Sequence, residues 1–361
     1  MKKVCFFIIC LCLFVQPVFV QADDKNITTA YQFSLTPEDK GWEKLSTTEE
    51  MVKAYQIPED ILKSMTTEAI VETIIDNPFL IQYMAYDTTE DALDMHFEVF
   101  NVYNELYSRD DVLQVLNEVY ENESVVTNAK TASTKFFRLT NLELLISTEL
   151  YLNDQTNFLT TNLGKNTNKT MQIHQEKSGE RYDAGIYSDY SDGFTWFEEN
   201  LKNKNSHSDL AKIAERSSTS TYVKTPKGTK VSAIIYDDMT AAEKKEKNDL
   251  YASLYPAAKR IYTATKKFNC HSYAWYSQKY STNKYWIRDP KAYREDGSYT
   301  VSKIAANRKV WYTNGTHSAI VSYYNNGTTL YTSKWGSYGL YSHAPTYGPP
   351  FGYKQGVKYY K

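Results

Sequence analysis

The chain has 361 residues, of which 23% are charged and 15% aromatic, and its formal net charge is −2. This length predicts two domains. So small a net charge gives no electrostatic case for an anionic partner, and we therefore expect no nucleic-acid partner. The 32 tyrosines are typical of strands, and a stacking surface for sugars or peptides is the alternative.

The N-terminus has the features of a secretory signal peptide over residues 1–22. Two lysines precede an apolar run over 4–15, which is too short to cross a bilayer, and Ala22 supplies a small residue at the expected cleavage point. A membrane anchor that is not cleaved is the alternative. We expect a mature protein that begins near Asp23, is secreted or associated with the cell wall, and has no membrane span after cleavage.

Cleavage of this leader would remove three of the four cysteines and leave only Cys270. The mature protein can then have no internal disulfide. A single thiol in an oxidising compartment is either a buried core residue or a reactive group. The residues around Cys270 have to distinguish the two.

After a polar lead over 23–45, helical periodicity predicts a helical domain over 46–155, with a helix start at Ser46 or Thr47. We expect this domain to have a structural or binding role. Over 156–217 the sequence loses periodicity and is rich in Asn, Thr, Ser and Lys, which predicts a polar linker or irregular region.

The final domain is predicted over 218–361, where the pattern changes to strands. Residues 221–225 and 229–236 are expected to form a hairpin around a Pro-Lys-Gly turn. Helical stretches are expected over 240–252 and again over 257–265.

The segment around Cys270 predicts a helix that starts at the cysteine. Tyr273, Ala274 and Tyr276 recur at helical spacing, and Asn269 is suited to cap the helix. In a first turn, backbone N–H groups and the helix dipole stabilise a thiolate. Because the thiolate is the reactive form, this position favours a nucleophile.

A candidate base follows 47 residues later. His317 begins a predicted strand, on the face that also carries Ala319 and Val321. If the helix of Cys270 packs on that face, thiol and imidazole meet. A satisfied structural histidine is the alternative.

A cysteine that opens a helix, followed by a strand that begins His-Ser-Ala-Ile-Val and by a hairpin partner, resembles the papain-like peptidase superfamily in its NlpC/P60 and CHAP branches. The resemblance covers residues 218–361. It implies an α+β fold, in which a papain-like domain with a cysteine helix packed on an antiparallel sheet follows the N-terminal helical domain. It also implies Cys270 as nucleophile, His317 as base and Lys309–Tyr312 as the preceding strand, with no metal or cofactor.

The third member of the site is less clear. If Asn326-Gly327 is a two-residue turn, Lys334 shares the face of His317, whereas a three-residue loop from Asn325 would place Ser333 there. We prefer Ser333, because a hydroxyl can accept the imidazole N–H and an ammonium cannot. The rival orienting group is His343.

These patterns predict a secreted cysteine hydrolase of amide bonds, an amidase or endopeptidase whose substrate is a peptidoglycan peptide or another peptide. The substrate follows from the resemblance and the expected compartment. A non-catalytic cell-surface protein with a degenerate papain-like domain is the alternative. It predicts a buried, unreactive Cys270 and no contact between Cys270 and His317. The bond cleaved and the oligomeric state stay open.

Overall fold

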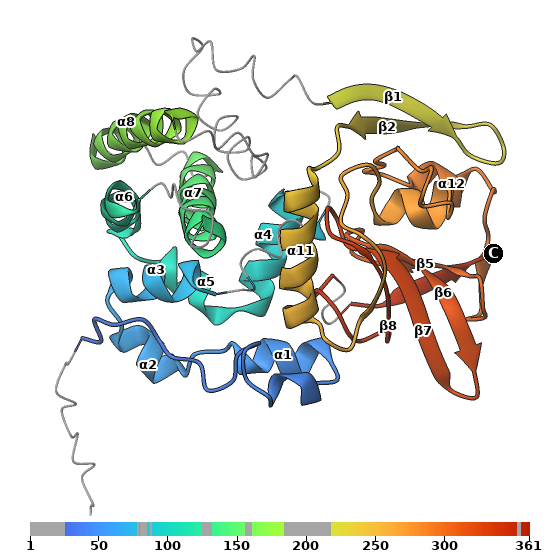
Figure 1. Cartoon of the computed structure of the whole chain (residues 1–361), viewed down its shortest axis with the longest axis horizontal. Coiled ribbons are helices and arrows are strands. Elements are labelled where there is room, and N and C mark those ends of the chain that lie inside the picture. The colour runs from blue at the N-terminus through green and yellow to red at the C-terminus, as the bar shows by residue number, and fades with distance from the viewer. Residues whose placement is uncertain are drawn as a thin grey trace, which may run out of the picture.

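The computed structural model describes residues 26–77, 79, 85–86, 89–124, 132–155, 161–183, 218–351 and 355–361. The predicted signal peptide and residues 184–217 of the predicted linker lie outside these ranges. Helices form the first half of the described chain and antiparallel strands dominate the second, so the α+β class is confirmed at this level (Figure 1).

The helical half begins with a short turn, η1, and continues through helices α1 to α8. The start of α1 is the one expected from the sequence: the Thr47 side chain accepts from the backbone N–H of Glu50, whose carboxylate accepts from the backbone N–H of Thr47. The bounds are Trp42–Lys44 (η1), Thr48–Ala54 (α1), Glu59–Ser64 (α2), Thr67–Ile75 (α3), Thr89–Val99 (α4), Asn101–Leu106 (α5), Val112–Asn122 (α6), Ala132–Gln155 (α7) and Thr161–Asp183 (α8).

Helix α8 lies where the sequence predicted an irregular region. Its polar composition hides the periodicity, because few of its residues are apolar. Yet Thr170, Ile173 and His174 are buried, and the Thr170 hydroxyl donates to Asn117 on α6 at 2.7 Å. Tertiary contact with α6 therefore stabilises a helix that the sequence pattern alone did not indicate.

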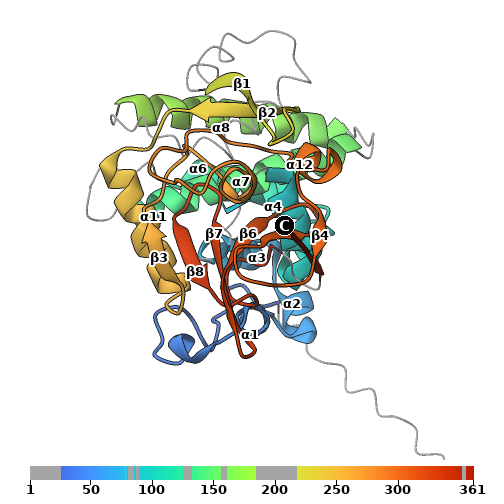
Figure 2. The same cartoon turned by 90° about the vertical axis from the view of Figure 1, so that its right-hand side faces the viewer.

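The second half contains the expected hairpin, β1–β2, and a seven-stranded antiparallel sheet in the order β3-β8-β7-β6-β5-β9-β4 (Figure 2). The bounds are Ser218–Lys224 (β1), Lys230–Tyr236 (β2), Ala241–Leu254 (α11), Lys259–Tyr262 (β3), Ser272–Tyr276 (η4, a π-helical turn), Lys291–Glu295 (α12), Val301–Ser302 (β4), Lys309–Tyr312 (β5), Ser318–Asn325 (β6), Thr328–Lys334 (β7), Leu340–His343 (β8) and Val357–Tyr360 (β9).

The helical stretch predicted over 257–265 is wrong, because β3 occupies its centre. This strand pairs with β8 at the edge of the sheet. The strand ladder, which forms between residues about 80 positions apart, overrides the local helical spacing. In the described ranges, no helix combines the length and the apolar character needed to cross a bilayer.

Two hydrophobic cores lie on either side of the sheet. The first joins the helical half and α11 to the sheet face that carries Ala319 and Val321. The second lies on the face of Ile320 and contains Trp275 of η4. Helix α11 lies between the helices and the sheet (Figure 1), and one continuous core joins the helical half, α11 and the first face of the sheet.

Candidate active site

Cys270 opens a helical turn that Asn269 caps, as the sequence predicts. The Asn269 Oδ1 accepts from the backbone N–H of Ser272 at 3.0 Å and of Ile287 at 3.1 Å, while its Nδ2 donates to the Ile287 carbonyl at 2.6 Å. The first helical hydrogen bond runs from the Tyr273 N–H to the Asn269 carbonyl. Cys270 is in no disulfide and is 1% exposed.

The helix of Cys270 packs on the sheet face that carries Ser318 and Ile320. The Trp275 Nε1 donates to the Ser318 hydroxyl at 2.8 Å, and the His271 Nδ1 lies 2.9 Å from the same oxygen. Burial, and secondarily the charge of Arg294, lowers the pKa of His271 to about 3. His271 is therefore a neutral residue of the buried packing and not a surface group.

The His317 side chain packs instead with the core on the other face. Its ring stacks on Phe351 with centroids 3.8 Å apart and planes within 1°, and the Tyr312 ring meets it edge-on at 5.1 Å. His317 is 0% exposed. Neither of its ring nitrogens has a hydrogen-bond partner within the described part of the chain. Burial, and then the charges of His343 and His271, lowers the pKa of His317 well below its ordinary value, which keeps the imidazole neutral.

Cys270 and His317 are thus brought into one neighbourhood without a hydrogen bond between them. Tyr312 links the two: its ring contacts His317, and Cys270, after burial and Tyr359, raises the pKa of Tyr312. The sequence argument placed the cysteine helix on the face of His317. The helix packs on the opposite face, so the expected contact is not formed in this arrangement.

The β6–β7 hairpin decides which polar residue shares the face of His317. Its turn has two residues, Asn326 and Gly327, both at positive φ, between the pair Asn325 and Thr328. By simple alternation this turn would place Lys334 beside His317. A β-bulge shifts the register by one residue beyond Val321 and reverses that outcome.

Ser333 consequently lies on the face of His317, but it bonds to the other histidine. Its hydroxyl is 2.8 Å from the His343 Nε2 and accepts from the Trp335 Nε1 at 2.9 Å. Burial lowers the pKa of His343 to about 4. Lys334 points to the opposite face, where its ammonium donates to the Thr265 carbonyl at 2.9 Å.

Phe351 belongs to a segment that connects the sheet to the helical half. Its carbonyl accepts from the Thr316 hydroxyl and from the Asn314 Nδ2, each at 2.6 Å. Its ring lies 5.1 Å from that of Tyr86 in the helical half. The Thr48 hydroxyl on α1 donates to the carbonyls of residues 346 and 348 in the same segment, at 3.0 and 2.9 Å. Phe351 and the segment from residue 346 to 351 cover His317, and we call them the cover. The cover is therefore tied to the helical half.

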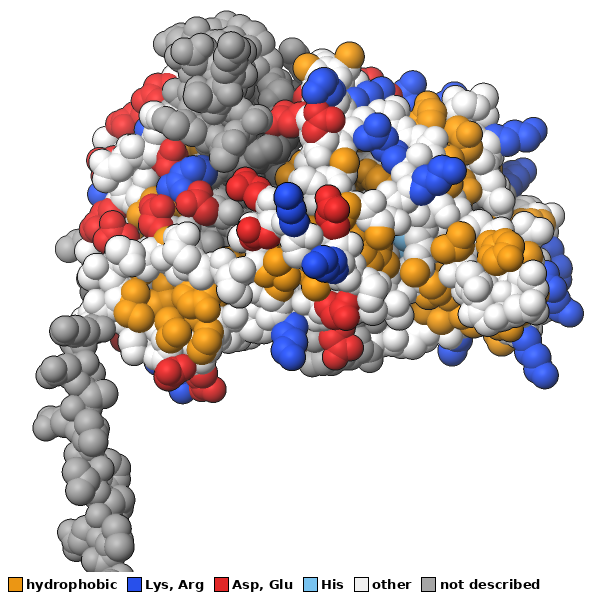
Figure 3. Space-filling model, turned by 60° about the horizontal axis from the view of Figure 1, so that its bottom comes forward, with side chains coloured by type: hydrophobic (Ala, Val, Ile, Leu, Met, Phe, Trp, Pro, Cys, Tyr) orange, Lys and Arg blue, Asp and Glu red, His pale blue; other side chains and the backbone are white. Residues whose placement is uncertain are grey.

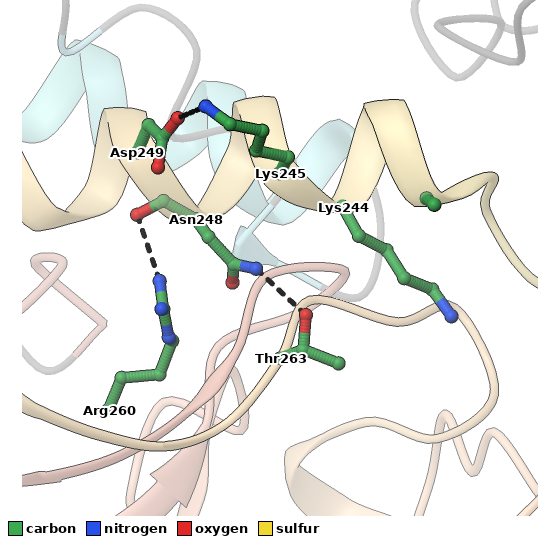
Figure 4. A pocket seen from close by; sticks show the side chains of 7 residues that line it. Lys244, Lys245, Asn248, Asp249, Arg260 and Thr263 are labelled. Carbon is green, nitrogen blue, oxygen red and sulfur yellow. Dashed lines mark hydrogen bonds and ion pairs between the residues drawn. The ribbon is translucent and has the colours of Figure 1, made fainter.

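A shallow hollow of about 300 Å³ lies elsewhere, between α11 and the chain after β3 (Figure 4). Its cations are already engaged: Lys245 pairs with Asp249 at 2.5 Å, and the Arg260 guanidinium donates to the Asn248 carbonyl at 3.3 Å. Neither Cys270 nor His317 lines it. Within the described ranges, no three His, Cys, Asp or Glu side chains are grouped as ligands of a metal.

Comparison of the chain with protein-family models, with curated proteins and with solved structures gives no match. Two residues that surround the candidate site were missed from the sequence. Ser318 could have been found, because strand alternation places it opposite His317. Phe351 gives no such signal, since it follows Pro349 and Pro350 in a segment without periodicity.

Proposed function

We propose that this chain is a secreted cysteine hydrolase of papain-like type, in a conformation in which the site is closed. The observation that carries the proposal is His317, a fully buried imidazole whose two ring nitrogens have no partner in the described chain. Leaving a buried polar group unpaired costs about 1–3 kcal/mol. His96 in the helical core is equally buried and likewise unpaired in the described chain. The position of His317 close to a helix-opening cysteine, together with this cost, is therefore what favours a functional role over a structural one.

The chemistry proposed is acyl transfer. His317 accepts the proton of the Cys270 thiol, and the sulfur attacks the carbonyl carbon of a substrate amide. The C–N bond then breaks, and the proton passes from His317 to the leaving amine. Water, deprotonated by His317, hydrolyses the thioester, which releases the acid and restores the thiol. The backbone N–H of Cys270 is the candidate donor to the oxyanion.

This reaction requires the site to open. When Phe351 leaves the imidazole, water reaches His317, and its pKa returns toward the ordinary value near 6.5, where it can act as a base at neutral pH. Because the helix of Cys270 packs on the opposite face of the sheet, the start of β6 must also shift before the imidazole can reach the thiol. Because Phe351 is tied to the helical half through Tyr86, that half is the part of the chain placed to control opening.

The substrate class proposed is the amide bond of peptidoglycan peptides. It rests on the resemblance of the segments around Cys270 and His317 to NlpC/P60 and CHAP domains and on the leader over residues 1–22. Ser333 is the proposed orienting residue, acting in the open form, since it shares the face of His317 and its hydroxyl already bonds to an imidazole.

A second candidate is a non-catalytic secreted protein that binds a partner at the cell surface. The burial of Cys270 and His317 and the lack of a hydrogen bond from His317 to the thiol favour it. In this reading both side chains are core residues and the thiol stays inert in every folded form.

The variant Phe351→Ala separates the two candidates. We would measure the rate at which iodoacetamide modifies Cys270 and the release of amines from a peptidoglycan digest, in folded protein checked by circular dichroism. The hydrolase proposal expects both rates to rise in Phe351→Ala. Hydrolysis should disappear when Cys270→Ser or His317→Asn is added.

Phe100→Ala is the matched control, because Phe100 is an equally buried aromatic residue of the helical core that does not contact His317. It should loosen the fold without raising either rate. If Cys270 stays unreactive in folded Phe351→Ala, the hydrolase proposal fails and the non-catalytic candidate replaces it.

A further inference from the structure

The near-neutral net charge of the chain conceals two oppositely charged halves. Residues 218–361 contain 22 Lys and Arg against 8 Asp and Glu, a formal charge of +14, whereas residues 23–217 contain 17 against 35, a charge of −18. Basic side chains gather over the sheet end of the molecule and acidic ones over the helical end (Figure 3). Ion pairs such as Lys169–Glu121 and Lys245–Asp249 are formed within one half.

Six lysines of the basic half lie along one edge of the fold, and we call them the lysine row. They come from the β1–β2 hairpin and from the β4–β9 edge of the sheet. All six are exposed, and none forms an ion pair within the described part of the chain. The lysine row consists of Lys224, Lys227, Lys230, Lys303, Lys358 and Lys361.

Backbone contacts place the segments that carry these lysines side by side. Lys224 and Lys230 are paired across the hairpin, and the backbone N–H of Lys227 at its turn donates to the Ser298 hydroxyl at 3.2 Å. Two residues further on, the backbone of Thr300 exchanges hydrogen bonds with that of Lys361. Strands β4 and β9 then pair along the edge that carries Lys303 and Lys358.

The carboxylate nearest to the hairpin turn is already committed to internal hydrogen bonds. Asp296 accepts from the Thr225 hydroxyl and from the backbone N–H of Ser298. In the helical half, by contrast, Arg138 is paired with three carboxylates, those of Glu72, Asp76 and Glu123. The lysine row is therefore a set of exposed cations that form no ion pair within the described chain.

We propose that the lysine row binds an extended, phosphate-bearing polymer. Lysine attracts phosphate as a point charge, and the row contains no arginine, which is the residue suited to bidentate and base-specific recognition of nucleic acid. A membrane surface would need apolar area beside the cations. Here Val301 is exposed alone at 66%, while Tyr222 lies beneath the ammonium of Lys230 at 4.4 Å. An elongated row on a sheet edge suits a chain of phosphates better than a single anion.

The test measures binding of long-chain inorganic polyphosphate to the full chain at several salt concentrations. Wild type should bind at low salt and lose affinity steeply as salt rises, because cations that contact a polyanion release its counterions. The variants K224Q/K227Q/K230Q and K303Q/K358Q/K361Q should each bind at least roughly tenfold more weakly and show a shallower salt dependence.

The matched control is K40Q/K44Q/K53Q, which removes the same charge from exposed positions of the helical half and should change affinity less than about twofold. Equal losses in control and row variants would overturn the proposal. So would tighter binding of duplex DNA at equal phosphate concentration, or binding only to vesicles that contain anionic lipid. The measurement does not involve Cys270 chemistry, so its outcome is independent of the proposed hydrolase function.

Discussion

Two buried histidines on opposite faces of the central sheet differ in their hydrogen bonding. On the face of Ser318, Asn269 makes three hydrogen bonds around the helix of Cys270, and His271 and Trp275 share the Ser318 hydroxyl. On the other face, His317 is equally buried and lies against Phe351 with both ring nitrogens unpaired in the described chain.

The comparison separates a buried histidine that has a hydrogen-bond partner from one that has none in the described chain. Buried polar groups in native proteins are paired in the great majority of cases, so an unpaired one requires a specific reason. At His271 the reason for burial is packing. At His317 the packing interaction with Phe351 leaves the imidazole without a partner, which is consistent with a group whose partner arrives only when the cover moves.

Among the variants that test this comparison, the largest loss of stability is expected from Asn269→Ala. The change removes a helix cap and leaves two buried backbone groups of Ile287 without partners, so we expect a loss of about 3 kcal/mol or more in the free energy of unfolding. Urea unfolding measures it. Asn104→Ala, which removes one exposed hydrogen bond, should cost less than about 1 kcal/mol. Similar losses in the two variants would mean that the hydrogen bonds of Asn269 are not a main source of stability.

Substitution of the two histidines by phenylalanine should have effects of opposite sign. His271→Phe leaves the Ser318 hydroxyl with one fewer buried partner and should destabilise the protein by about 2 kcal/mol. His317→Phe replaces an unpaired buried imidazole by an apolar ring of similar shape and should stabilise by about 1–2 kcal/mol while it removes the proposed base. Thermal or urea unfolding gives both values. A destabilising His317→Phe would show that the imidazole has a structural partner.

The free energy of unfolding should depend on pH because several histidines are buried in the folded protein. An unfolded histidine binds a proton as the pH falls below about 6.5, whereas burial lowers the pKa of His271 to about 3 and of His343 to about 4 in the folded protein. The unfolded state then binds more protons, so the free energy of unfolding falls as the pH falls from about 6.5 toward 4.

Each such histidine contributes a slope of up to about 1.4 kcal/mol per pH unit. His317, whose pKa burial also lowers, should contribute one of these slopes, and His317→Phe should remove it between pH 6 and 5. Urea unfolding at several pH values measures the slope. An unchanged slope would mean that His317 takes up its proton in the folded state, in conflict with its burial.

The smallest effect is expected from Thr48→Val, which removes the hydroxyl that ties α1 to the segment of Phe351. We expect a loss of about 1 kcal/mol for that contact and a roughly fivefold rise in the population in which the segment opens. Modification of His317 by diethylpyrocarbonate, followed by mass spectrometry, reports that opening. Thr282→Val, at an exposed threonine far from this contact, should leave the rate unchanged. The backbone N–H of Thr48 still donates to the Thr346 carbonyl in the variant, so equal rates in both variants would show that the Thr48 hydroxyl does not hold the cover.

Local signals in the sequence predicted much of this arrangement. The capped helix start at Cys270, the strand after His317 and a hairpin turn within Asn325–Gly327 each depend on a few neighbouring residues, and each is present. The sequence left the length of that turn open, and the preferred Ser333 reaches the face of His317 through the β-bulge and not through a three-residue loop. The face on which the cysteine helix packs could not be predicted, because both faces of β6 are apolar. The cover by Phe351 and helix α8 depend on contacts between distant segments, and no local pattern indicates them.

The β-bulge in the β6–β7 hairpin also bears on how the length of this chain can vary. The bulged strand holds one residue more than its partner, at Ser322, whose exposed side chain donates to the Leu330 carbonyl of the same hairpin. A deletion of that residue would let the hairpin pair regularly while Val321 still faces Tyr331 and Ser333 keeps its side of the sheet. Deletions elsewhere in β6 would reverse the side chains that follow. This position is therefore where the domain can lose a residue and keep the site in register.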